Sequence, residues 1–140
     1  MSAQQIVVTA VVDAPQDVAW TVFTSPEHIT QWNFASPDWC CPSADVDLRT
    51  GGTYTARMEA RDGSMGFDFA GTYDEVEAPR VAALRLEDGR VARTEFSESD
   101  GKTTVQTTFD AEDVNPVEMQ RAGWQAILDN YKAHAERVAG

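Results

Sequence analysis

Three side chains are of the types that carry acid–base chemistry and lie close to apolar residues: His28, Asp68 and Tyr73. A histidine at the rim of an apolar pocket would act as a general base, and a carboxylate or phenol beside it would assist proton transfer. His28 follows a turn opened by proline, which favours a helix-start or surface position. Asp68 stands between Phe67 and Phe69, so on a strand its carboxylate points to the opposite, solvent side. The sequence therefore assembles no catalytic set, and we expect no catalytic residue.

The remaining reactive side chains have simpler expected roles. Cys40 and Cys41 are adjacent, and a disulfide between neighbours needs a strained ring, so both are expected as reduced thiols. His28 and Asp38 do not complete a recognisable ligand spacing with them, so we expect no metal and no cofactor. His134 lies in the last turns of a C-terminal helix, where a solvated cation is favoured.

Large apolar side chains indicate a pocket more strongly than they indicate chemistry. A curved sheet and one helix do not readily fill the space that they enclose, and bulky side chains beside the opening would line it. A filled core is the alternative, and a shift of one residue in strand register would reverse the face that looks inward. The residues expected to line this cavity are Trp32, Phe34, Trp39, Met58, Phe67, Phe69, Tyr73, Phe96, Met119 and Trp124.

Antiparallel strands must position most of these side chains. Alternation of apolar and polar residues from Thr53 to Arg61, and again over 65–74, predicts two strands joined by the Asp62-Gly63 turn, across which Asp68 would pair with Arg57 or Arg61. Other strands are predicted at 5–12, 80–87, 91–98 and 103–110. Two short helices are predicted after Pro15, and residues 32–52, with two prolines and a glycine pair, are expected as a loop that carries large aromatics.

A single long helix is predicted over residues 115–138. Asn115 is its expected N-cap, with Pro116 at the first helical position and Glu118 in the first turn. Apolar residues along one stripe, among them Trp124 and Tyr131, would pack on the sheet. The order of strand, two short helices, consecutive strands and a long helix is an α+β arrangement.

The length of 140 residues fits one domain, expected over 1–140, with one core.

Composition limits the classes of partner. Eleven Lys and Arg against 23 Asp and Glu give a net charge of −12, which disfavours nucleic acid and anionic membranes as partners. The start Met1 to Gln5 lacks signal-peptide character and no stretch would span a bilayer, so a cytoplasmic location is expected. Exposed sheet edges leave a homodimer open.

Short motifs in a fixed order carry a family resemblance from about residue 7 to residue 135. The motifs are Ala14-Pro15, Thr24-Ser25-Pro26-Glu27-His28, Gln31-Trp32-Asn33-Phe34, Asp47-Leu48-Arg49, Gly71-Thr72-Tyr73 and the run Glu118 to Asn130. With these motifs the chain resembles the single-domain bacterial homologues of the activator of the heat-shock chaperone ATPase, in the START-like, or polyketide-cyclase-like (SRPBCC), superfamily. The resemblance implies a helix-grip fold, in which a curved antiparallel sheet wraps around a long C-terminal helix with a cavity between them.

The resemblance implies no single reaction, because members of this superfamily include lipid carriers, cyclases and chaperone regulators. Our leading hypothesis is noncatalytic binding of a small hydrophobic molecule in the cavity. One alternative is an enzyme of the polyketide cyclase or hydrolase type that uses His28, Asp68 or Tyr73 on a bound apolar substrate. The other is a stress-response co-chaperone that contacts the heat-shock chaperone.

Overall fold

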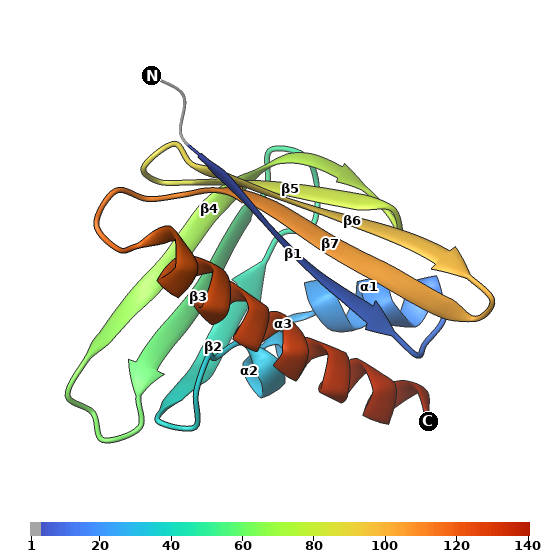
Figure 1. The fold of residues 1–140 in the computed structure, drawn as a ribbon, viewed down its shortest axis with the longest axis horizontal. Helices are drawn as coiled ribbons and strands as arrows, with labels where there is room; N and C mark the ends of the chain where they lie inside the picture. The colour runs from blue at the N-terminus through green and yellow to red at the C-terminus, as the bar shows by residue number, and fades with distance from the viewer. Residues whose placement is uncertain (1–3) are drawn as a thin grey trace.

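The computed structural model describes residues 4–140, so Met1 to Ala3, part of the segment without signal-peptide character, lie outside the described residues. A seven-stranded sheet curls along one side of the C-terminal helix (Figure 1). The elements in chain order are β1 (Gln5–Val12), α1 (Gln16–Thr24), α2 (Pro26–Trp32), β2 (Trp39–Val46), β3 (Thr53–Ala60), β4 (Gly66–Glu77), β5 (Val81–Leu86), β6 (Val91–Ser99), β7 (Lys102–Asp110) and α3 (Val117–Ala139).

The sheet is antiparallel throughout, in the order β1-β7-β6-β5-β4-β3-β2. Strands β2 to β7 form a meander, and β1 joins it at β7, where Ile6 lies opposite Phe109. Because β1 and β2 are the two edges of the sheet, the helices α1 and α2 that connect them cross from one edge to the other. This arrangement confirms the predicted α+β helix-grip fold.

Strand β1 shows how alternation assigns its two faces. Its residues alternate between exposed and buried along the whole strand: Val7 and Val11 are about half exposed, whereas Ile6, Val8 and Val12 are buried. The buried set faces α3, because successive side chains of a strand point to opposite faces. The sequence pattern therefore fixes both the strand and its inward face.

Strand β2 corrects the prediction of a loop over residues 32–52. Residues Trp39–Val46 form an edge strand, and its one partner strand within residues 4–140 is β3. Its register shifts between Cys40 and Ser43, and Pro42 lies in that irregular stretch. Proline lacks the N–H that a ladder requires, so an edge strand at a bulge tolerates it. The interruption by Pro42 had concealed the strand.

The start of α3 also differs from the prediction. Pro116 occupies the N-cap position without a side-chain cap, and the Asn115 amide bonds to Glu112 instead. The turn is held by Gln120: its Nε2 donates to the carbonyl oxygens of Asn115 and Glu112, and its Oε1 accepts from the Glu112 N–H. A buried glutamine one turn into the helix therefore supplies the contacts expected from an Asn115 cap.

Helix α3 is held to the short helices by aromatic residues. Tyr131 is fully buried, and its hydroxyl donates to the Ala19 carbonyl oxygen in α1 at 2.6 Å. Its ring packs edge-on against Phe23 of α1 and Trp32 of α2. The Trp32 indole N–H donates to the Val22 carbonyl oxygen at 3.0 Å. These contacts position the α1–α2 pair at one end of α3.

Within residues 4–140 no helix is both long enough and apolar enough to cross a membrane.

Candidate functional site

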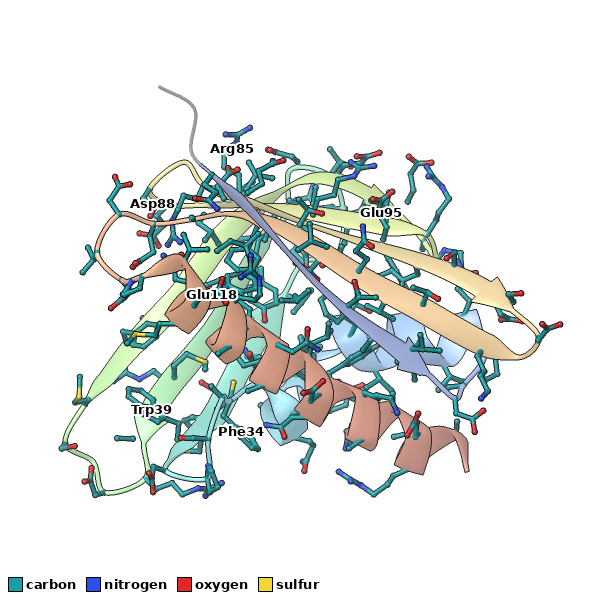
Figure 2. All side chains as sticks on the ribbon, viewed as in Figure 1. Phe34, Trp39, Arg85, Asp88, Glu95 and Glu118 are labelled. Atoms are coloured by element: carbon teal, nitrogen blue, oxygen red, sulfur yellow. The ribbon has the colours of Figure 1, made fainter. Side chains whose placement is uncertain are left out.

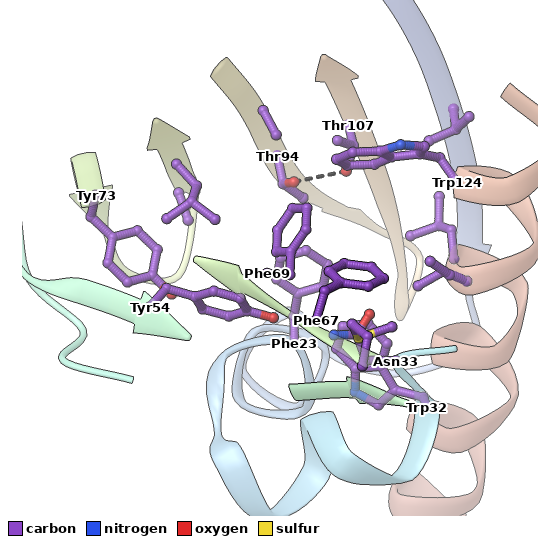
Figure 3. Close-up of a pocket in the computed structure, with 17 residues that line it drawn as sticks. Phe23, Trp32, Asn33, Tyr54, Phe67, Phe69, Tyr73, Thr94, Thr107 and Trp124 are labelled. Carbon is purple, nitrogen blue, oxygen red and sulfur yellow. Dashed lines mark hydrogen bonds between the residues drawn. The ribbon is translucent and has the colours of Figure 1, made fainter. Parts of the chain in front are cut away.

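A cavity of about 290 Å³ lies between the concave face of the sheet and the helices (Figure 3). Every strand except β2 contributes to its wall, as do α1, α2 and α3. The lining residues are Val8, Phe23, Trp32, Asn33, Tyr54, Met58, Phe67, Phe69, Tyr73, Ala82, Leu84, Ala92, Thr94, Thr107, Trp124, Ile127 and Leu128.

Strand β4 provides the densest part of the wall. Phe67, Phe69 and Tyr73 share one face of the strand and all line the cavity. Gly71 completes this face: a Cβ there would lie 2.5 Å from the carbonyl oxygen of Arg85 on β5, so only glycine lets the two strands approach. Phe67 is half exposed although it lines the cavity, which places it at the mouth.

Aromatic rings form a continuous row across the cavity. Tyr54 lies edge-on to both Tyr73 and Phe69, with ring centroids 6.2 and 6.3 Å apart. Phe69 in turn lies 6.3 Å from Trp124, and Trp124 stacks on Phe109 of β7 at 3.9 Å. Edge-on contacts at these distances are favourable, so the rings support one another. Trp124, held by Phe109, carries the row from the sheet to α3.

Two tyrosine hydroxyls contact the cavity without a protein partner. Among the described residues, the hydroxyls of Tyr54 and Tyr73 form no hydrogen bond. Every fully buried polar side-chain atom in this part of the chain has a partner, so these two hydroxyls are not fully buried. Both hydroxyls therefore reach accessible space, and Figure 3 shows Tyr54 pointing towards the centre of the lining residues. Burial raises the pKa of Tyr54, with further contributions from Tyr73 and Cys41, and burial also raises the pKa of Tyr73. Both phenols are thus neutral hydrogen-bonding groups at neutral pH.

A second polar group lies on the sheet. Thr94 of β6 and Thr107 of β7 are direct partners in the ladder, and their Oγ atoms lie 2.7 Å apart in a hydrogen bond. The two side chains are 4% and 5% exposed, and both line the cavity. One hydroxyl of the pair donates to the other, so the second keeps a proton that it can donate. The pair therefore offers a bound molecule both a donor and acceptor sites.

Among residues 4–140, no charged side chain lines the cavity. Asp68, which follows Phe67 on β4, lies on the outer face and pairs with Arg57 at 3.4 Å, as predicted. Arg57 also bonds to Glu59, so the two carboxylates share one guanidinium outside the cavity. The cavity wall is thus apolar, with hydroxyl groups from β3, β4, β6 and β7 and the amide of Asn33.

The residues predicted to line a pocket fall into two groups. Trp32, Met58, Phe67, Phe69, Tyr73 and Trp124 line the cavity. Phe34, Trp39, Phe96 and Met119 do not.

Each of these four has another position. Trp39 is the first residue of β2, and Phe34 lies in the segment before it (Figure 2). The Phe34 ring faces the Arg61 guanidinium, and Trp39 packs edge-on against Phe67 at 6.1 Å. Phe96 is buried against Trp20 and Phe23. Met119 is 61% exposed in the first turn of α3. Trp39 and Phe96 therefore contact the lining residues Phe67 and Phe23 without lining the cavity themselves.

The sequence analysis did not name several lining residues as site residues. Tyr54 had a usable signal, because it shares a strand face with Met58. Phe23 also follows the apolar spacing of its helix. Thr94 and Thr107 had none, since polar residues on an inner face are recognised only once the register between β6 and β7 is known.

The candidate catalytic residues do not come together. His28 lies in α2, and its Nδ1 is 3.1 Å from Nε2 of His134 in α3, outside the cavity. His134 is therefore half-buried and paired, and the prediction of a solvated surface position is wrong. Burial lowers the pKa of His134, and His28 and Arg137 lower it further. Only Tyr73 of the three candidates touches the cavity.

The two cysteines are free thiols, as expected, and differ in environment. Cys41 is buried, and burial raises its pKa above the ordinary thiol value, whereas Cys40 is partly exposed. A raised thiol pKa lowers the fraction of reactive thiolate. Within residues 4–140 no group of three or more His, Cys, Asp or Glu side chains has the geometry of a metal site.

The curled sheet, the long C-terminal helix and the internal cavity define a START-like helix-grip domain. The sequence profile of the family described as "Activator of Hsp90 ATPase homolog 1-like protein" matches residues 13–136. The chain therefore belongs to this family, which confirms the resemblance seen in its motifs.

Solved structures agree with this assignment. The AHSA1-like protein from Aeromonas hydrophila is 41% identical, with a TM-score of 0.90 and coverage of 96% of this chain and 94% of that one. Chr148 from Cytophaga hutchinsonii is also 41% identical, with a TM-score of 0.82 and coverage of 96% and 93%. NE0264 from Nitrosomonas europaea, at 17% identity, a TM-score of 0.82 and coverage of 96% and 95%, shares the fold. Among curated proteins, none matches the chain.

Proposed function

We propose that this protein binds a small apolar molecule reversibly in its internal cavity and leaves it chemically unchanged. The observation that carries the proposal is the cavity of about 290 Å³, walled mainly by aromatic and aliphatic side chains. Small-molecule sites in proteins are typically concave and apolar, with a few polar groups, and begin at about 300 Å³. Phe67 at the mouth gives a bound molecule a route from solvent.

The chemistry of the wall favours binding over catalysis. General acid–base catalysis needs a group that changes protonation near the working pH, within reach of the substrate. The lining residues with ionisable side chains are Tyr54 and Tyr73, and burial raises the pKa of both. Neither is a base at neutral pH. His28, the better base, is bonded to His134 outside the cavity.

The proposal is tested with N-phenyl-1-naphthylamine, an uncharged dye whose fluorescence rises in apolar surroundings. We expect saturable enhancement with the native protein and its loss in the Ala92→Leu variant, because Ala92 lines the cavity and a larger side chain would occupy that space. Ala133→Leu is the matched control, since Ala133 is exposed on α3. Equal binding by both variants, or none by the native protein, would contradict the proposal.

Native mass spectrometry of the freshly purified protein gives a second readout. A molecule bound in the cavity stabilises the native state by RT ln(1 + L/Kd), where L is its free concentration. We expect an adduct of defined mass with the native protein and with Ala133→Leu, and none with Ala92→Leu. An adduct retained by Ala92→Leu would place the binding site elsewhere.

A further inference from the structure

The size of the cavity limits the size of its ligand. A dry apolar cavity of about 150 Å³ in another protein holds one benzene molecule. The cavity here has about twice that volume. A molecule with two fused six-membered rings therefore matches the space, whereas a single ring would leave much of it unfilled. The row of edge-on rings from Tyr54 through Phe69 to Trp124 favours a flat aromatic occupant, because aromatic edges and faces attract one another.

The tyrosine end of the cavity holds hydroxyls that have no protein partner. Tyr73 is 5% exposed, and its hydroxyl has no hydrogen bond within the described residues. Tyr54 beside it points inward, also unpartnered. By contrast, the Tyr131 hydroxyl, outside the cavity, donates to the Ala19 carbonyl oxygen. A polar group in apolar surroundings is costly unless it is hydrogen-bonded, so this end favours a ligand with an oxygen function.

The threonine end lies across the cavity. Strand β5 separates Tyr73 on β4 from Thr94 on β6. Because Tyr73 aligns through Leu84 with Ala92, Thr94 lies two strand steps across the sheet and two residues along it, a backbone separation of roughly 12 Å. Thr94 and Thr107 use one proton for their mutual bond and leave one hydroxyl free to donate. The aromatic ring of Phe69 lies between the two polar ends, and Trp124 lies beside Thr107 (Figure 3).

Charge is unfavourable at both ends. In the part of the chain that the structure describes, the cavity wall contains no Asp, Glu, Lys, Arg or His. An ionised ligand would leave water without gaining an opposite charge, which is strongly unfavourable. The burial that raises the pKa of Tyr54 and Tyr73 would act on a ligand carboxylate in the same direction.

We propose that the ligand is an uncharged, flat aromatic molecule of about two fused rings, with a hydroxyl or carbonyl oxygen at each end, one bonded by Tyr54 or Tyr73 and the other by the Thr94–Thr107 pair. This inference rests on the proposed binding function and specifies the chemical class that the cavity accepts.

Calorimetric titration of the full chain at pH 7 with five probes tests the inference. The probes are naphthalene-2,6-diol, 2-naphthol, naphthalene, hydroquinone and the anion 6-hydroxy-2-naphthoate. We expect the diol to bind most tightly and each lost oxygen to weaken binding about 3- to 10-fold, the net value of one hydrogen bond. The anion is expected to bind more weakly than 2-naphthol. Hydroquinone, with one ring, is expected to bind more weakly than the diol.

Matched variants assign the two ends. One of the two variants Tyr54→Phe and Tyr73→Phe, the one that removes the bonding hydroxyl, is expected to weaken diol binding about 3- to 10-fold and to leave naphthalene binding unchanged. Thr107→Val is expected to act in the same way at the other end. Tyr131→Phe and Thr103→Val are the controls, because their hydroxyls bond to the carbonyl oxygens of Ala19 and Ala14 outside the cavity. Both controls are expected to bind the diol as the native protein does.

The outcomes separate this inference from the binding function. Equal affinity for the diol and naphthalene, equal effects of the variants and their controls, or tight binding of the anion would overturn the inferred ligand class. The binding function would still stand if N-phenyl-1-naphthylamine bound and Ala92→Leu abolished that binding. Failure of the dye and of every naphthalene probe would overturn both.

Discussion

Tyr131 and Tyr54 are two tyrosines of the interior whose hydroxyls contribute differently to stability. The Tyr131 hydroxyl bonds to the Ala19 carbonyl oxygen at 2.6 Å and joins α3 to α1. The Tyr54 hydroxyl has no partner among the described residues. Removing a buried hydrogen bond costs about 1–2 kcal/mol, whereas removing an unpartnered hydroxyl costs little. The contribution of a buried polar atom thus depends on its partner more than on its depth.

We predict that Tyr131→Phe lowers the free energy of unfolding by about 1–2 kcal/mol and that Tyr54→Phe changes it by less than about 0.5 kcal/mol. Urea denaturation of both variants at pH 7, followed by circular dichroism, measures the difference. Similar losses in the two variants would show that the Tyr54 hydroxyl has a partner after all.

At the scale of helices and strands, the sequence predicted elements with regular patterns and missed those that depend on tertiary contacts. Alternation was sufficient for β3 and β4, because each keeps one apolar face. Strand β2 has no such alternation and contains Pro42, so only its pairing with β3 defines it. Asn115 has the right residue type for a cap, but its amide bonds to Glu112, and Gln120 holds the turn instead.

The pairing of α2 with α3 was equally inaccessible from the sequence, because His28 and His134 are 106 residues apart. In the folded protein burial and the nearby His28 and Arg137 lower the pKa of His134 from its ordinary value of 6.5. As the pH falls, His134 is therefore protonated more readily in the unfolded chain than in the folded one. The free energy of unfolding decreases as the pH falls below about 6.5. Well above that pH, His134 is neutral in both states and does not contribute to the pH dependence of stability.

We predict that the urea midpoint of the native protein falls between pH 7.5 and pH 5.5, and that His134→Gln reduces this fall. Glutamine keeps a polar side chain of similar reach but does not titrate. This pH range lies above the titration of Glu77 and Glu136, whose pKa values are lowered by their Arg80 and Lys132 partners. An unchanged pH dependence in His134→Gln would assign the effect to other groups.

At the scale of the whole molecule, the cavity follows from the architecture. Seven strands curl around one helix, and the enclosed space is wider than the side chains from the two sides can fill. The sequence showed which faces were apolar, and Phe67, Phe69 and Tyr73 followed from strand alternation. It could not show that Phe96 packs behind Phe23, or that Thr94 meets Thr107, because both facts depend on how distant strands are aligned.

A cavity of this size is expected to limit stability. At about 24 cal/mol per Å³, a dry cavity of 290 Å³ would cost roughly 7 kcal/mol, comparable with the net stability of a small domain. Water or a ligand that enters past Phe67 reduces that cost. A larger apolar side chain at a lining position, which fills part of the cavity permanently, should therefore stabilise the fold. It buries new apolar surface without displacing the other lining residues.

We predict that Ala92→Leu, which is expected to abolish ligand binding, raises the free energy of unfolding by about 1–2 kcal/mol, because its added methyl and methylene groups are buried at about 0.8 kcal/mol each and lose some of that gain to strain. Ala133→Leu, exposed on α3, should change it by less than about 0.5 kcal/mol. Urea denaturation of ligand-free protein measures both. A loss of stability in Ala92→Leu would mean that the wall beside Ala92 is already filled, and that the cavity cannot hold a two-ring ligand at that point.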